Sequence, residues 1–137
     1  MGKHIYLRAY LAGIAVPTVL LLVAMTLYTI LRVIYRFPVP IERVIVFPMA
    51  IVPNLWGLWN VVYVAFLARH RFPLGLHGDA LVFLVSPLGF LFARVLEFPL
   101  PHIFFVLAPI AIPVGLAVYY LAWKYLVGFL NAELGIA

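Results

Sequence analysis

The chain alternates between long apolar runs and short polar clusters, and this pattern predicts helices that cross a membrane. Residues 9–31, 44–68 and 98–123 contain no charged side chain. Each run is longer than the about 20 residues that a helix needs to cross roughly 30 Å of hydrocarbon. The run at 80–93 is shorter, but a helix extended past Arg94 is long enough, because arginine can place its charged head at the interface. We predict four transmembrane helices, at about 9–35, 44–68, 79–97 and 103–127.

Composition excludes an ordinary water-soluble domain. Of the 137 residues, 68% are hydrophobic and 9% are charged, and the mean hydropathy is +1.21. Soluble domains are about 45–50% apolar and about 25% charged. The formal net charge of +5 is more typical of contact with anionic lipid headgroups than of nucleic-acid binding. We therefore expect membrane lipids as partners, and no nucleic acid.

Two stretches of the chain repeat each other at a constant offset of 61 residues. The segment Phe37–Pro40 (FPVP) matches Phe98–Pro101 (FPLP). The same offset relates further residues, namely Pro48 to Pro109, Ala50 to Ala111 and Leu27 to Leu88. Each copy would contain two helices, so both copies would have the same orientation in the membrane. We predict an all-α integral membrane protein built from two tandem helical hairpins, residues 1–70 and 71–137, which together form a single membrane domain.

Prolines recur inside the even-numbered helices of this prediction. They are Pro48 and Pro53 in the second helix, and Pro109 and Pro113 in the fourth. A proline inside a helix removes a backbone hydrogen bond and bends or breaks the helix. The four prolines therefore either kink the helices and improve packing, or break the helices and open a transporter-like site at corresponding places in both repeats.

The first helix carries polar residues on one face, and the third begins near a polar residue. The residues Thr18, Thr26, Thr29, Arg32 and Arg36 follow steps of three, four or eight residues, which place them on the same side of a helix. We expect this side to face the interior of the bundle. Asp79, which precedes an apolar run, is expected to be the N-cap of the third helix.

The second helix has the most unusual local composition in the chain. Asn54, Trp56, Asn60 and Tyr63 lie within one apolar run, although tryptophan is usually found at membrane interfaces. Buried amides need hydrogen-bond partners. One hypothesis is that these residues join neighbouring helices. The other is that they form a candidate pocket for a lipid, a quinone-like ring or another amphiphile.

Arginines near the predicted helix ends suggest contact with lipid headgroups. Arg32, Arg36 and Arg94 form a candidate site for an anionic headgroup, with simple interfacial anchoring as the alternative. Arg94 and Glu97 are three residues apart and could pair. The Arg69–Arg71 loop slightly favours a cytoplasmic location for both termini, in the cytoplasmic (plasma) membrane.

No catalytic or cofactor motif is recognisable. The chain has four histidines, His4, His70, His77 and His102. All of them lie outside the middle of the predicted spans, which argues against transmembrane haem or metal binding. The only serine, Ser86, lacks the sequence context of a nucleophile. There is no cysteine, so disulfides and thiolate metal sites are excluded. We expect no enzyme activity, no catalytic residue, no metal and no cofactor.

These observations favour a non-enzymatic membrane protein, either a structural or accessory subunit or a component that assembles with itself. Such a protein would be a homo-oligomer or would bind partner membrane subunits. The first alternative is a small oligomeric transporter or channel with a site near the proline-interrupted helices. The second alternative is binding of a lipid or a quinone-like amphiphile.

Overall fold

The computed structural model describes residues 3–36, 38 and 47–136, and all the regular structure in them is helical. The first hairpin contains α1 (Ile5–Ile34), the π-helical turn η2 (Phe47–Ile51), α2 (Val52–Val62), η3 (Tyr63–Leu67) and η4 (Ala68–His70). The second hairpin contains α3 (Leu74–Val95), α4 (His102–Leu121), η5 (Ala122–Val127) and α5 (Gly128–Glu133). Because η2, α2, η3 and η4 follow one another directly, as do α4, η5 and α5, the described residues form four long rods.

All four rods are long and apolar enough to cross a membrane. They extend over Ile5–Ile34, Met49–His70, Leu74–Val95 and His102–Glu133. This confirms the prediction of an all-α protein with four apolar helices of membrane-spanning length, which indicates membrane association. Residues 44–46 at the predicted start of the second helix lie outside the described residues, as do Phe37, Val39 and Pro40 of the first repeated segment.

The third helix begins earlier than predicted, and Asp79 is not its N-cap. The N-cap position is Pro73, with φ −61° and ψ 122°, and the helix begins at Leu74. Proline fixes φ near −65° and is tolerated at the beginning of a helix, where its missing N–H costs nothing. Gly75 and Gly78 remain in the helix because bulky rings pack against them, namely Tyr120 and Trp123. Asp79 therefore lies inside α3.

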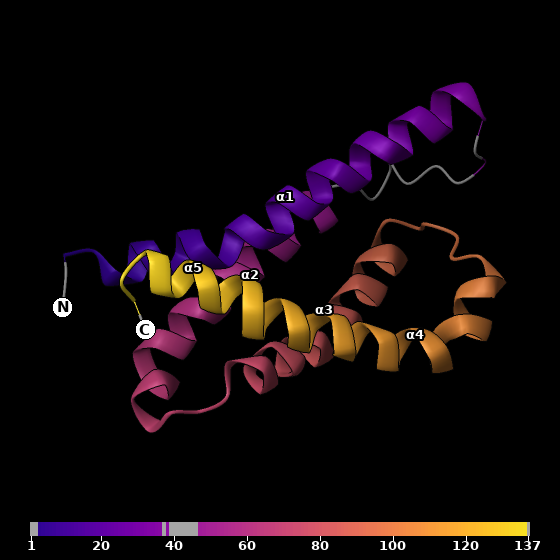
Figure 1. Ribbon diagram of the computed structural model, residues 1–137. Coiled ribbons are helices and arrows are strands. Elements are labelled where there is room, and N and C mark those ends of the chain that lie inside the picture. Colours follow the sequence, from indigo (N-terminus) through magenta and orange to yellow (C-terminus); the bar gives the residue numbers. More distant parts are fainter. Residues whose placement is uncertain (1–2, 37, 39–46, 137) are drawn as a thin grey trace.

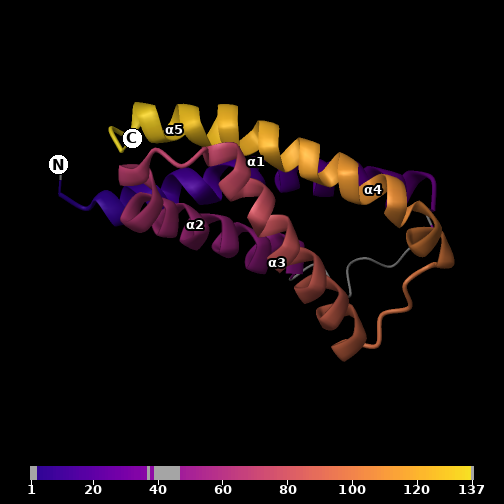
Figure 2. The ribbon, with the colours of Figure 1, turned by 90° about the horizontal axis from the view of Figure 1, so that it is seen from below.

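The two hairpins differ in how their helices approach each other (Figures 1 and 2). α1 packs along α2, and the turn after η4 lies at the same end of the molecule as both described chain ends. A Cβ atom on Gly13 would lie 2.5 Å from the Trp56 carbonyl oxygen and 2.7 Å from the Gly57 Cα. Small residues thus let the two backbones meet. In contrast, the last part of α3 diverges from the beginning of α4.

The main hydrophobic cluster lies in the half of the molecule that holds the termini, whereas Ala93 and Phe98 are buried toward the other end. The buried members of this cluster are Val16, Trp56, Leu81, Ala122, Trp123 and Val127. In α1 no residue after Pro17 is buried, and α4 has no buried residue at all. One half of the molecule is therefore densely packed, and the other exposes apolar helix surface to its surroundings.

The threonines of the first helix do not face the bundle, contrary to our expectation. Thr18, Thr26 and Thr29 are all exposed. The hydroxyl of Thr26 donates to the Leu22 carbonyl oxygen and that of Thr29 to the Met25 carbonyl oxygen, each at 2.8 Å. A threonine that bonds to its own helix in this way can face lipid without an unpaired hydroxyl. The inward expectation was wrong because α1 extends beyond the core in this region.

Candidate functional site

Two buried asparagines join the first part of α1, the last turn of α2 and α5. Asn60 is fully buried, and its Nδ2 donates to the Ala9 carbonyl oxygen at 2.7 Å and to Asn131 Oδ1 at 2.8 Å. Asn131 Nδ2 donates in return to Asn60 Oδ1 at 3.1 Å. These bonds satisfy most of the polar groups of both amides, whose burial without partners would be costly. Asn60 thus acts in helix packing.

Aromatic rings fill the space next to this amide pair. Trp56 stacks on Trp123 with ring centroids 5.1 Å apart, and it meets the Tyr119 ring edge to face at 5.0 Å. Trp56 Nε1 donates to the Tyr119 hydroxyl at 3.3 Å. Trp123 is fully buried, and its Nε1 has no hydrogen-bond partner among the described residues. Rings of the second and fourth rods therefore pack together around Trp56.

His77 is buried in the same layer of the molecule. Its ring is parallel to that of Trp59, with centroids 4.8 Å apart. His77 Nε2 bonds the Trp59 carbonyl oxygen at 2.7 Å, and Trp59 Nε1 donates to the His77 carbonyl oxygen at 2.7 Å. Sequence reasoning placed His77 in a loop because it started the helix at Asp79. Gly75 and Gly78, which lie two and one positions from His77, were the sequence signal that another helix packs closely here.

The remaining two residues of the candidate pocket have local partners. The Tyr63 hydroxyl donates to the Phe72 carbonyl oxygen at 2.8 Å, which links η3 to the turn before α3. Asn54 is exposed, accepts a hydrogen bond from the Tyr10 hydroxyl, and donates to the Ala50 carbonyl oxygen at 3.0 Å. The structure thus brings Trp56, Asn60 and Tyr63 into the packed half, with their polar groups engaged by protein, and leaves Asn54 at its surface.

The candidate headgroup residues lie toward the other end of the molecule. Arg32 is in the last turn of α1 and Arg94 is in the last turn of α3. Arg36 and Glu97, which follow these helices, have φ of 50° and 52°. Within the described residues Glu97 forms no ion pair with Arg94, because the chain turns away after α3. A headgroup role for the three arginines stays a prediction.

The prolines occupy different positions in the second and fourth rods. Pro48 falls in η2, and Pro53 is in the first turn of α2, which continues directly from η2. Pro109 and Pro113 are inside α4. The proposed kinks stay a prediction, and so does a transporter site at these residues.

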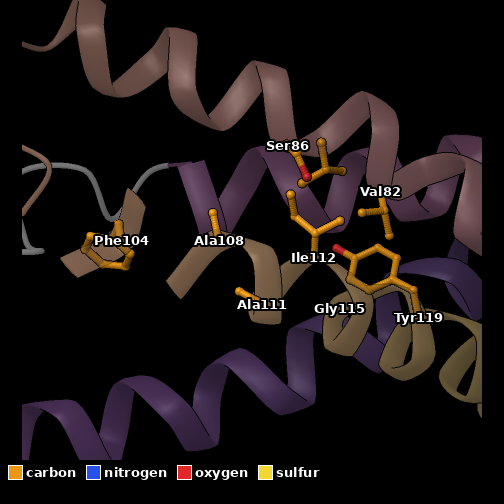
Figure 3. A pocket seen from close by; sticks show the side chains of 9 residues that line it. Val82, Ser86, Phe104, Ala108, Ala111, Ile112, Gly115 and Tyr119 are labelled. Atoms are coloured by element: carbon orange, nitrogen blue, oxygen red, sulfur yellow. The ribbon is translucent and has the colours of Figure 1, made fainter. Parts of the chain in front are cut away.

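A groove lies between the diverging parts of α3 and α4 (Figure 3). It has a volume of about 290 Å³. Its walls are Val82, Val85 and Ser86 from α3, and Phe104, Ala108, Ala111, Ile112, Gly115 and Tyr119 from α4. Gly115 has no atom within 4 Å of the position that a Cβ would occupy. Two hydroxyls, those of Ser86 and Tyr119, are the polar side-chain groups of an otherwise apolar wall.

No protein-family model, curated protein or solved structure matches the chain. In the described part of the chain, no group of three or more His, Cys, Asp or Glu side chains could hold a metal ion. The side-chain geometry is therefore the basis for any assignment of function.

Proposed function

We propose that the protein is a non-enzymatic component of a membrane assembly, whose loosely packed half binds a second copy of the chain. The observation that carries this proposal is that α4 has no buried residue, although it supplies the first 20 residues of a rod, His102–Glu133, that is long and apolar enough to cross a membrane. The buried polar groups of the other half are meanwhile used to hold the helices of one chain together. This division fits a protein with a stable end and an end available for assembly.

The outer side of α4 has side chains suited to packing. Besides the residues that line the groove, it presents Ile103, Leu107, Ile110, Val114 and Val118, all about half exposed or more. Isoleucine and valine have restricted χ1 rotamers, so they lose little conformational freedom when a partner covers them. Because membrane helices associate through packing and not through exclusion from water, such a stiff and regular surface favours association.

We also propose that the two hairpins are a tandem repeat. α1 ends at Ile34 and α3 ends at Val95, which are 61 residues apart. The residues with φ near 50° after these helices, Arg36 and Glu97, have the same offset. Equivalent helix endings at the repeat period support a common origin. The hairpins then differ through their packing, since α1 stays against α2 while α3 diverges from α4.

Because the chain has no cysteine, single cysteines can test the assembly directly in membranes. We expect Ile110→Cys to form a disulfide-linked dimer on mild oxidation, because Ile110 is 66% exposed on the outer side of α4. Phe66→Cys is the matched control, since Phe66 is 63% exposed but lies in the packed half. It should give only the background expected from random collision.

Three results of experiments on the same membranes would contradict binding of a second copy. Equal cross-linking of both variants, which disappears on dilution with lipid, would mean that lipid alone covers α4. Copurification of a different membrane protein in fixed ratio would replace the second copy with a partner subunit. Reproducible solute flux in vesicles of the wild-type protein would favour a transporter.

For orientation, we propose the cytoplasmic membrane with both termini in the cytoplasm. The turn after η4 lies at the end with the termini, and the connection between α3 and α4, which contains Glu97, lies toward the opposite end (Figure 1). A membrane-impermeant maleimide should therefore label Glu97→Cys in intact cells and label His70→Cys only after the cells are opened. The reverse pattern would invert the orientation.

A further inference from the structure

The groove between α3 and α4 has the chemistry of a binding site within the bilayer. We infer that it binds an apolar molecule that carries a carbonyl oxygen and dissolves in the hydrocarbon core, with an isoprenoid quinone as the fitting class. The inference is independent of the proposed assembly, because both walls of the groove belong to one chain.

The two hydroxyls of the groove both have a hydrogen-bond donor available. Tyr119 Oη accepts a hydrogen bond from Trp56 Nε1 at 3.3 Å, which leaves the proton of the tyrosine hydroxyl unused. Ser86 Oγ has no hydrogen-bond partner in the part of the chain that the structure describes. Figure 3 shows the two side chains extending from opposite walls into the same space. Two donors from different helices select a ligand with an acceptor oxygen.

The depth of these hydroxyls distinguishes a quinone from a phospholipid. Ser86 lies 12 residues after Leu74 and 9 residues before Val95. At about 1.5 Å per residue, it is about 18 Å and 14 Å from the ends of its helix, which is close to the middle of a hydrocarbon core about 30 Å thick. Phospholipid ester carbonyls lie at the interface, whereas a quinone ring on an isoprenoid chain can enter the core.

The walls of the groove fit a flat ring with an apolar tail. Small residues of α4, Ala108, Ala111 and Gly115, leave room beside Ile112, and Phe104 lies toward the beginning of the helix. The volume of about 290 Å³ is near the lower end of the about 300–1,000 Å³ that is usual for small-molecule sites. An apolar pocket with a few convergent polar groups is the usual form of a ligand site.

Tryptophan fluorescence provides the test, because Trp56 contacts Tyr119 and quinones quench indoles on contact. Purified protein in lipid nanodiscs would be titrated with a short-chain ubiquinone analogue. We expect two components of quenching: one that increases linearly with quinone concentration because of random collisions, and one that saturates because quinone binds to the groove. Removing one donor in Ser86→Ala should weaken the apparent affinity about three- to tenfold. Tyr119→Phe should do the same, but it also removes the acceptor of Trp56.

Filling the groove gives the decisive comparison. In Gly115→Leu the saturable quenching should disappear while the linear part remains, since the added side chain occupies the cavity. Purely linear quenching that is the same in wild type and Gly115→Leu would overturn the inference. So would equal competition by an alkane without a carbonyl group, or cross-linking of Gly115→Cys between two copies, which would place a helix in the groove.

Discussion

Gly13→Leu is expected to separate α1 from α2 and to cost the protein about 3 kcal/mol of unfolding free energy. The position of a Cβ at Gly13 is already occupied by the backbone of α2, at 2.5 Å from the Trp56 carbonyl oxygen. A flexible side chain could rotate away, but a helix backbone cannot yield without moving the whole helix. Unfolding in mixed micelles of increasing denaturing-detergent content, followed by tryptophan fluorescence, measures the loss.

Gly115→Leu is the matched control, since it makes the same chemical change in another transmembrane helix. Nothing lies within 4 Å of the Cβ position at Gly115, and leucine is a better helix former than glycine. We expect its unfolding free energy to equal or exceed that of the wild type. Equal losses in both variants would show that the close crossing of α1 and α2 does not stabilise the fold.

The helical architecture could be predicted from sequence because lipid imposes a simple requirement. Every backbone group in the hydrocarbon must bond within the protein, so an uncharged run of sufficient length forms a helix. Helix boundaries were harder to predict. The beginning of α3 was placed at Asp79 because a carboxylate before an apolar run is a common N-cap, whereas the structure starts this helix at Leu74. Burial of His77, which packs between Trp59 and Trp123, overrides that local signal.

The candidate site could be predicted only in part, for a similar reason. Trp56 and Asn60 stood out because polar and interfacial residues inside an apolar run need partners. The identity of those partners depended on the positions of other helices, so Asn131 and His77 were not identified. The groove was also inaccessible to sequence reasoning, because it depends on the angle between α3 and α4. From the sequence, Ser86 is an isolated serine without the context of a nucleophile, and its position in the groove depends on that angle.

Asn60→Leu is expected to lower the unfolding free energy by about 2–3 kcal/mol. The substitution removes three hydrogen bonds, of 2.7, 2.8 and 3.1 Å, which join Asn60 to Ala9 and Asn131. The larger part of the cost arises because the amide of Asn131 stays buried at 1% exposure without its partner. The detergent titration used for the glycine variants measures the change.

The double variant separates the cost of the orphaned amide from the value of the pair. If Asn131 is costly only because it has lost its partner, Asn60→Leu/Asn131→Leu should be less destabilised than the sum of the two single variants, by about 1 kcal/mol. Asn54→Leu makes the same change at the exposed surface of the same helix and should cost about 1 kcal/mol or less. Strict additivity in the double variant would mean that the two amides do not act as one unit. The packed half of the molecule would then be held by its aromatic rings, and Trp123, which stacks on Trp56, would become its main support.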